Sequence, residues 1–581
     1  MSTSTAGNPP TANIAPESSL SSSDNFGSEV RSLLVSHGSN CAAGSTPVVS
    51  VATPESLDHQ IILGSLSDWP SLEESQELLD LVVLNVGISQ QLFDVRLFSD
   101  NLLRLYRGST GQETRSTLWI VKALLIMAVG RLLQARLAPN EVPGQSLFQA
   151  AVEFLPGLSI LKHHGILGIE VVALCALYLQ IADRKEEAYI HASLALRLAI
   201  ACGMHKASSD QTPSRSEAVH RNRLWWRLAA AGGYPMAIHD EAVTVNPPED
   251  VAGFPSAAAI AMNVRAARIT GQITWSCTEA SLIGGVQSIF QSLDDLERTM
   301  PAEYIMDFEG PQIKVGGIPF TKSNRSTART SSSLYLSIYQ AIIHAGRPIL
   351  LYMARKRYEA HTDAYSCPGP SLRRLAEVCV EAASRSLLVL HELRNGSIIA
   401  KNAFLDLDAV FSVGFVFVLV DVIAPGRDLG AYGIEVSRYI LSYLAQLGNR
   451  AASRRLAELD QMCAHLGCRP NQPPRESSPT NILSQRFSFE RGYEATPVSR
   501  RGSMGLGGHS IRHADAEALS GQDVPGHGDL PVDEPPNMSL SDISLAGEDG
   551  LFWVFQPGVY TGAELADWEM LENQIFAAGS A

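Results

Sequence analysis

Helical patterning, with no strand-like alternation over any useful length, constrains this sequence more than any other feature. From residue 66 to residue 468, apolar residues recur at the spacing of helix faces. A helix with an apolar face must bury that face against other elements. We therefore expect an all-α, multi-helix domain over residues 66–468.

Caps and apolar faces predict the individual helices. Ser71 stands where it would cap a first helix, with Glu74 reaching back towards it. Another helix is expected at 332–357, broken at Gly346 and Pro348, because proline removes a helical donor. A polar, glycine-rich loop is expected at 312–330. Further helices are expected at 118–137, 269–300 (as one or two), 372–393, 403–422 and 436–466.

The stretch from Glu187 to Asp250 is the most distinctive. It opens with a helix in which Ile190, Leu194 and Leu198 recur at helical spacing, and Gly203 stands where such a helix would end. A second helix, EAVHRNRLWWRLAAA, follows a polar linker. The chain then breaks at two glycines and becomes too rich in proline and acid to stay helical.

Three motifs in this stretch carry a family resemblance: ALRLAIACGMH, RNRLWW and PMAIHDEAVTVNPPED. In this order they resemble the central signature of the fungal-specific transcription factor domain. The resemblance implies an all-helical regulatory region, which in that family usually follows a binuclear zinc-cluster DNA-binding module. One departure stands out: the helix after Trp226 stops within about six residues at Gly233, and Tyr234 stands where the family has arginine. Either the helix is trimmed in this protein or the sequence is a mis-spliced gene model.

Charge is distributed unevenly along the chain. The net charge is -15, but residues 1–95 hold 11 acidic residues and one basic residue, and residues 513–581 hold 13 acidic residues and no Lys or Arg. The middle of the chain is therefore mildly basic. Residues 1–65 are rich in Ser, Thr, Pro and Gly with few aromatics, a composition typical of a disordered arm.

A second segment of biased composition spans residues 469–548, where we expect a disordered linker. Within it Ser503 follows Arg500, Arg501 and Gly502, a pattern that suits phosphorylation by a basic-directed kinase. Such short matches also arise by chance in serine-rich linkers, so both readings stay open.

The segment 549–581 interleaves aromatic and aliphatic residues with Glu and Asp and contains no Lys or Arg. Acidic residues keep exposed aromatic side chains in water until a partner groove binds them, which is typical of activation segments. The alternative is a terminal helix that folds back on the domain. The expected anchors of an activation segment are Phe552, Trp553, Phe555, Trp568, Leu571 and Phe576.

The sequence lacks the common motifs for metal binding and catalysis. Eight cysteines are scattered without any C-x2-C spacing, so they cannot form a zinc cluster. The sequence contains no P-loop, G-x-S-x-G or H-E-x-x-H motif. Asp294 and Asp295 are the candidates for a magnesium site, but Arg298 follows where a further acid is needed, which favours a solvated helix face. We therefore expect no enzyme and no cofactor, with zinc only if a cluster module lies upstream.

These features favour a nuclear transcriptional regulator, with the cytoplasm as a second compartment. The tail would bind the transcription machinery or co-activators, and the helical domain could form a homodimer or a heterodimer with a zinc-cluster regulator. DNA would be reached only indirectly, and no membrane is expected. The alternatives are an interaction module that sequesters or pairs with a full-length regulator, and a truncated gene model of one.

Overall fold

The computed structural model describes eleven stretches of the chain between residues 69 and 466. They are residues 69–87, 91–107, 116–134, 142–207, 214–231, 240–271, 279–309, 312–359, 369–402, 404–425 and 428–466. The expected N-terminal arm, C-terminal linker and acidic tail all lie outside these residues.

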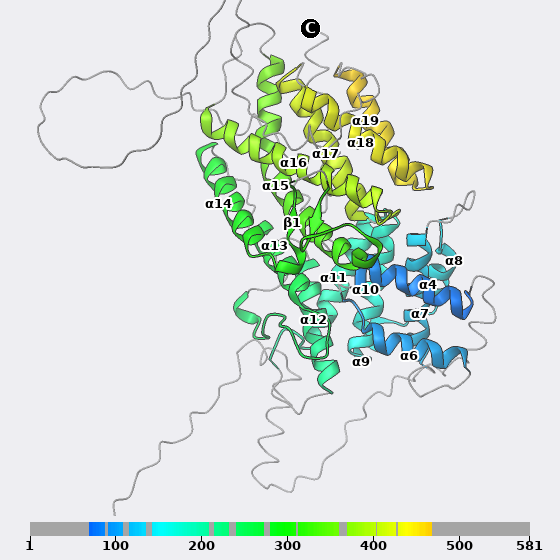
Figure 1. Cartoon of the computed structure of the whole chain (residues 1–581). Helices are drawn as coiled ribbons and strands as arrows, with labels where there is room; N and C mark the ends of the chain where they lie inside the picture. The colour runs from blue at the N-terminus through cyan, green and yellow to red at the C-terminus, as the bar shows by residue number, and fades with distance from the viewer. Residues whose placement is uncertain are drawn as a thin grey trace, which may run out of the picture. The chain divides into compact units, whose positions relative to one another are not determined.

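The described residues form fifteen α-helices, so the predicted all-α class is confirmed (Figure 1). The helices are α4 (Leu72–Val82), α6 (Val95–Tyr106), α7 (Thr117–Gln134), α8 (Gln145–Glu153), α9 (Leu158–His163), α10 (Ile166–Ile181), α11 (Lys185–Ala201), α12 (Arg215–Ala231), α13 (Ala258–Thr270), α14 (Glu279–Arg298), α15 (Arg325–Glu359), α16 (Pro370–Asn395), α17 (Phe404–Ile423), α18 (Asp428–Gln446) and α19 (Arg450–His465). The short elements are the π-helical turn η1 (Val83–Gly87) and the 3₁₀ turns η2 (Asp240–Ala242), η3 (Ala302–Tyr304) and η4 (Lys322–Asn324).

Several predicted helix boundaries are confirmed. The Ser71 side chain caps α4 by accepting a hydrogen bond from the Glu74 N–H at 3.2 Å. Gly203 follows α11 with φ of +67°, the left-handed conformation that ends helices. The face of α11 differs from the prediction, since Ile190 is 61% exposed. Small residues form the buried face instead, namely Ala188, Ala192, Ala195 and Ala199.

A three-stranded antiparallel sheet follows α14, in the order β1 (Met306–Asp307), β2 (Lys314–Val315), β3 (Ile318–Pro319). Val315 pairs with Ile318 across Gly316 and Gly317, which both have positive φ, as a two-residue hairpin turn requires. The prediction of an irregular loop over 312–330 was therefore wrong: the segment holds two short strands and the start of α15.

The expected break at Gly346 and Pro348 is also wrong, because α15 continues through both residues. The helix tolerates them because it is packed along its length. A Cβ at Gly346 would lie only 2.9 Å from the Cβ of Cys379, so glycine lets α15 and α16 approach closely. This packing offsets the free energy lost because Pro348 has no backbone N–H to donate within the helix.

The single helix expected over 436–466 is two helices, α18 and α19. Gly448 adopts φ of +93° between them, and the Asn449 side chain caps α19 by accepting from the Ala452 N–H. Helix α13 was not predicted, because the next helix after the proline-rich stretch was expected to begin only at Ile269.

Two hydrophobic cores organise the described residues. The first core joins the buried apolar side chains of α4 to α12, from Leu78 onwards, and the second joins those of α13 to α19, ending at Cys463. Helix α13 serves both. Ile260 and Val264 lie in the first core, whereas its opposite face lies in the second through Ala259, Met262 and Ala266. Figure 1 shows α12 and α13 between the blue to cyan helices and the green to yellow ones.

A cluster of charged side chains also connects the cores. Asp183, in the turn between α10 and α11, pairs with Arg454 and Arg455 of α19. Arg455 also pairs with the buried Asp408 of α17, and the Lys185 ammonium lies 3.6 Å from the same carboxylate. Burial raises the pKa of Asp408 and lowers that of Lys185. The contacts of Asp183 and Lys185 cross more than 200 residues of sequence and tie the start of α11 to α17 and α19.

Helix α7 is the one described helix long and apolar enough to cross a membrane. Of its residues, 83% are buried inside the protein, where they form the centre of the first core. The apolar character of α7 is thus used for packing against α4, α8 and α10.

Candidate functional site

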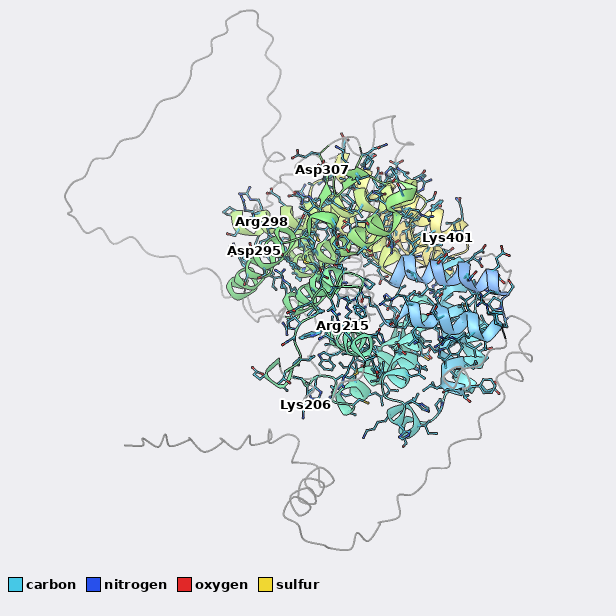
Figure 2. The ribbon with its side chains drawn as sticks, turned by 60° about the horizontal axis from the view of Figure 1, so that its bottom comes forward. Lys206, Arg215, Asp295, Arg298, Asp307 and Lys401 are labelled. Carbon is cyan, nitrogen blue, oxygen red and sulfur yellow. The ribbon has the colours of Figure 1, made fainter. Side chains whose placement is uncertain are left out.

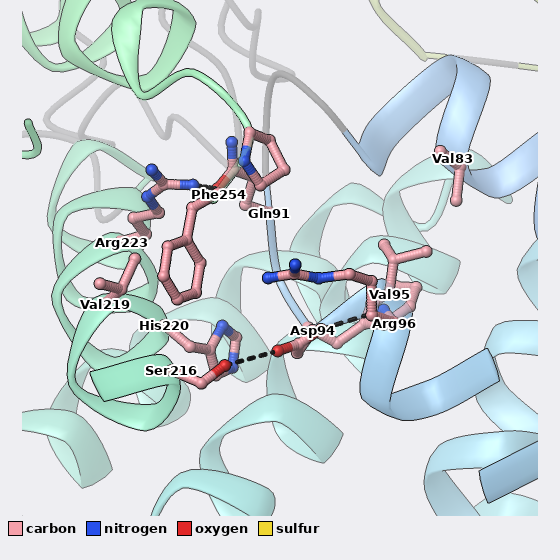
Figure 3. A pocket seen from close by; sticks show the side chains of 12 residues that line it. Val83, Gln91, Asp94, Val95, Arg96, Ser216, Val219, His220, Arg223 and Phe254 are labelled. Carbon is pink, nitrogen blue, oxygen red and sulfur yellow. Dashed lines mark hydrogen bonds between the residues drawn. The ribbon is translucent and has the colours of Figure 1, made fainter. Parts of the chain in front are cut away.

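A pocket of about 330 Å³ opens between the start of α6, the first half of α12 and the segment that leads into α13 (Figure 3). Three parts of the chain far apart in sequence supply its walls. The lining residues are Val83, Gln91, Phe93, Asp94, Val95, Arg96, Ser216, Val219, His220, Arg223, Phe254 and Pro255.

Asp94 fixes the α6 wall. Its Oδ1 caps α6 by accepting from the N–H groups of Arg96 at 2.9 Å and Leu97 at 3.2 Å. Its Oδ2 accepts a hydrogen bond from the Ser216 hydroxyl at 3.3 Å, which ties α6 to α12. Both oxygens therefore accept hydrogen bonds within the protein, so this carboxylate acts as a structural cap of α6.

Arg96 is the exposed cation of the pocket. Its Nη1 donates to the carbonyl oxygen of Gly253 at 3.0 Å, and its guanidinium carbon lies 5.1 Å from the centre of the Phe254 ring. In Figure 3 the Phe254 ring lies between the Arg96 guanidinium and α12. The cation–π contact holds Phe254 in the pocket.

Arg223 is the buried cation, with only 3% of its surface exposed. Its Nη1 donates to Oε1 of Gln91 at 2.8 Å, and Gln91 in turn donates to the carbonyl oxygen of Ser256. The Nε and Nη2 nitrogens are buried without a hydrogen-bond acceptor among the described residues. Burial lowers the pKa of Arg223, Asp250 opposes that effect, and Arg96 adds to it.

His220 is held by a buried ionic group behind the pocket. Its Nε2 lies 2.8 Å from Oε1 of Glu170, and the Lys122 ammonium lies 2.8 Å from Oε2 of the same carboxylate. Burial alone would raise the pKa of Glu170, but Lys122 and His220 outweigh it, so the pKa is lowered. A charged Glu170 fixes the orientation of the His220 ring.

This arrangement can bind an acceptor-rich ligand but offers no catalytic pair. The Ser216 hydroxyl donates to Asp94, so it is not activated by His220. Within the described stretches, no group of three or more His, Cys, Asp or Glu side chains could hold a metal ion. The pocket therefore combines two guanidinium groups and an imidazole with apolar walls, which is the composition of a binding site.

The site residues predicted from sequence lie elsewhere. Ser503 and the six tail anchors, Phe552, Trp553, Phe555, Trp568, Leu571 and Phe576, are outside the described residues, so their roles stay predictions. Asp294 pairs with Arg298 on an exposed face of α14, and Figure 2 shows Arg298 and Asp295 at the outer edge of the helices. The prediction of a solvated helix face there is confirmed.

The basic and aromatic side chains of α12 are structural rather than a nucleic-acid surface. Trp225 and Trp226 are both buried in the first core, and Arg221 donates to the carbonyl oxygen of Gly203 behind α11. Sequence reasoning noted Arg223 beside the two tryptophans but did not identify it as a pocket residue. Neither Arg96 nor Phe254 was noted, because nothing in their local sequence marks them.

Comparison with known proteins places the chain beside fungal regulators of transcription. It is 24% identical, over 63% of its length, to an uncharacterized transcriptional regulatory protein of Schizosaccharomyces pombe, and covers 47% of that protein. It is 22% identical, over 69% of its length, to the thiamine repressible genes regulatory protein thi1 of the same yeast, and covers 53% of it. The chain thus spans about half the length of these relatives. No protein-family profile matches it.

Proposed function

We propose that this protein is a fungal regulator of transcription whose helical body is a control domain and whose C-terminal segment recruits the transcription machinery. The observation that carries the proposal is the similarity to two S. pombe regulatory proteins over about two thirds of the chain. The all-helical architecture agrees with it, and the proposed place of action is the nucleus.

In this proposal the chain does not read DNA by itself. The printed sequence contains no cysteine spacing that could close a zinc cluster. Two acidic ends flank a mildly basic middle, so no concentrated basic module is present either. The protein would reach promoters by pairing with a zinc-cluster regulator, as a partner or as an antagonist that sequesters it.

A reporter assay tests the recruiting role. The whole chain is fused to an unrelated DNA-binding domain upstream of a reporter gene, in parallel with a variant in which Trp553, Phe555 and Trp568 are alanine. The whole chain should activate the reporter, and the variant should lose most of the signal because its groove-binding side chains are gone. A matched control replaces three exposed residues of the described body. Equal activity of the whole chain and the tail variant would refute the role of the tail.

A binding assay separates the two ways of acting at promoters. The purified chain should bind promoter DNA at physiological salt no better than non-specifically, with a Kd of about 10⁻⁴ to 10⁻⁶ M. Co-purification with a zinc-cluster regulator, followed by recruitment of the pair to DNA, supports partnership. Loss of the regulator's DNA binding in the complex supports sequestration, and sequence-specific binding by the chain alone would contradict both.

A further inference from the structure

The pocket between α6 and α12 has a polar end and an apolar end. Arg96, Arg223 and His220 supply the polar end, and Asp94 is the one acidic side chain in the lining. The apolar end consists of Val83, Phe93, Val95, Val219, Phe254 and Pro255. A ligand that fits both ends carries a negative group at one end of an apolar body.

The unsatisfied donors of Arg223 indicate which group the polar end binds. Two of its nitrogens are buried without an acceptor among the described residues. Leaving charged donors unpaired is costly, and native proteins rarely do so without a reason such as a bound ion or ligand. The nearby Asp250 carboxylate does not relieve the cost by direct contact, because neither of these nitrogens has a hydrogen-bond partner. Oδ1 of Asp250 accepts from the Ala257 N–H and the Ser256 hydroxyl instead.

In Figure 3 the Phe254 ring lies below the Arg223 guanidinium and beside the Arg96 guanidinium, which it contacts. The buried nitrogens of Arg223 are shielded, so an incoming acceptor reaches them only after a covering side chain moves. Phe254 lies in an irregular segment, just after Gly253 with its φ of +86°, and its own contact with Arg96 is a modest cation–π interaction. An anion that pairs with Arg96 competes directly with that contact.

We propose that this pocket binds a small organic monocarboxylate with an apolar body, held by Arg223 and Arg96. A planar carboxylate matches the two parallel donors of a guanidinium better than other acceptors of its size. With two arginines and one aspartate the lining has a net charge that one negative charge neutralises. The volume, about 330 Å³, is at the lower end for ligand sites and holds on the order of ten to fifteen non-hydrogen atoms.

The position of the pocket gives ligand binding a route to the rest of the domain. Phe254 lies three residues before Ala257, where α13 begins to form, and the two faces of α13 lie in the two cores. A carboxylate that displaces Phe254 therefore acts on the helix that both cores share. That this controls transcription rests on the proposed function, whereas ligand binding itself does not.

Titration of the purified full-length chain tests the proposal. The probes are phenylacetate, its neutral analogue phenylacetamide, acetate and inorganic phosphate, followed by calorimetry and thermal denaturation. Phenylacetate should bind about tenfold or more tightly than phenylacetamide, because only the acid makes charge-assisted hydrogen bonds. Phenylacetate should also bind more tightly than acetate by a similar factor, because acetate has no apolar group to contact the apolar walls.

Three variants assign the binding to the two arginines. Arg223→Met and Arg96→Gln should each weaken phenylacetate binding by about tenfold or more. Arg104→Gln, which replaces an exposed arginine of α6 outside the pocket, should leave it unchanged. Arg223→Met should melt no lower than the parent protein, since it removes unpaired buried donors. If Arg223→Met does not fold, the comparison of Arg96→Gln with its control Arg104→Gln tests the proposal by itself.

Several results would overturn the proposal. They are equal binding of acid and amide, undiminished binding by the Arg96 variant, tighter binding of phosphate than of phenylacetate, and no binding of phenylacetate up to about 20 mM, where even a weak site should respond. These measurements involve neither DNA nor a reporter gene. Failure of the reporter assay would therefore not contradict ligand binding, and failure of ligand binding would not contradict the recruiting role of the tail.

Discussion

The buried ion pair between Arg329 of α15 and Asp406 of α17 is the most sensitive test of how the second core is held together. The side chains are 3% and 0% exposed. Arg329 Nη1 donates to both carboxylate oxygens at 2.8 Å, and the Ala400 N–H donates to Oδ2 at 2.9 Å. The Asp406→Asn variant keeps the shape of the side chain but leaves a buried guanidinium without its counter-charge.

The expected cost follows from this geometry. Breaking a buried pair by removing one partner typically costs about 3 to 5 kcal/mol, because the remaining charge stays desolvated. A direct estimate agrees, since unit charges about 4 Å apart at an effective dielectric constant near 20 attract by about 4 kcal/mol. A loss of about 4 kcal/mol lowers the ratio of folded to unfolded protein by nearly three orders of magnitude.

Urea denaturation followed by tryptophan fluorescence measures this loss. Asp294→Asn, in the exposed pair with Arg298, is the matched control and should cost less than about 1 kcal/mol because solvent screens that pair. The double variant Arg329→Met with Asp406→Leu should recover most of the stability, because it leaves no buried charge. A loss below about 1 kcal/mol for Asp406→Asn, or a double variant as unstable as the single one, would refute the reasoning.

Three further predictions concern packing, protonation and capping. Gly168→Ala should lower the free energy of unfolding by about 1 to 3 kcal/mol or more, since its Cβ would lie 2.1 Å from the Leu161 carbonyl oxygen. The Cβ of Gly284→Ala would meet nothing within 4 Å, so this control should raise the free energy of unfolding by about 0.5 to 1 kcal/mol. Equal urea midpoints for the two variants would contradict both expectations. Burial, and to a lesser extent Arg347, hold the pKa of His344 well below its usual value. As pH falls below about 6.5, only the unfolded chain therefore binds a proton at this imidazole. The free energy of unfolding should then drop by up to about 1.4 kcal/mol per pH unit. His344→Gln should flatten this part of the stability profile, and an unchanged slope between about pH 7 and pH 5 would show that His344 is not its source. Ser71→Ala should cost about 1 kcal/mol through the lost cap of α4, and a variant as stable as the parent in the same assay would show that the cap contributes nothing.

The sequence predicts the helices of this fold well where local chemistry decides them. Ser71 and Gly203 end helices by interactions within a few residues, so their roles can be read directly. The errors arise where packing decides. Helix α15 continues through Pro348 because neighbours bury most of its length. Ile190 faces solvent because alanines provide the closer approach on the other side of α11. Such outcomes depend on contacts that sequence spacing does not contain.

The pocket could not be predicted, for a related reason. Arg96, Arg223 and Phe254 come from three segments, and each has an ordinary local explanation: a residue in the first turn of α6, a cation beside two tryptophans, and an aromatic in a proline-rich loop. Their meaning arises only when the fold brings the two guanidinium groups into the lining of one pocket, with the Phe254 ring against Arg96. Even then, buried nitrogens without an acceptor are what distinguish Arg223 from the other side chains that line the pocket. A functional signal of this kind is a missing interaction, and it can be recognised only after the interactions around it are known.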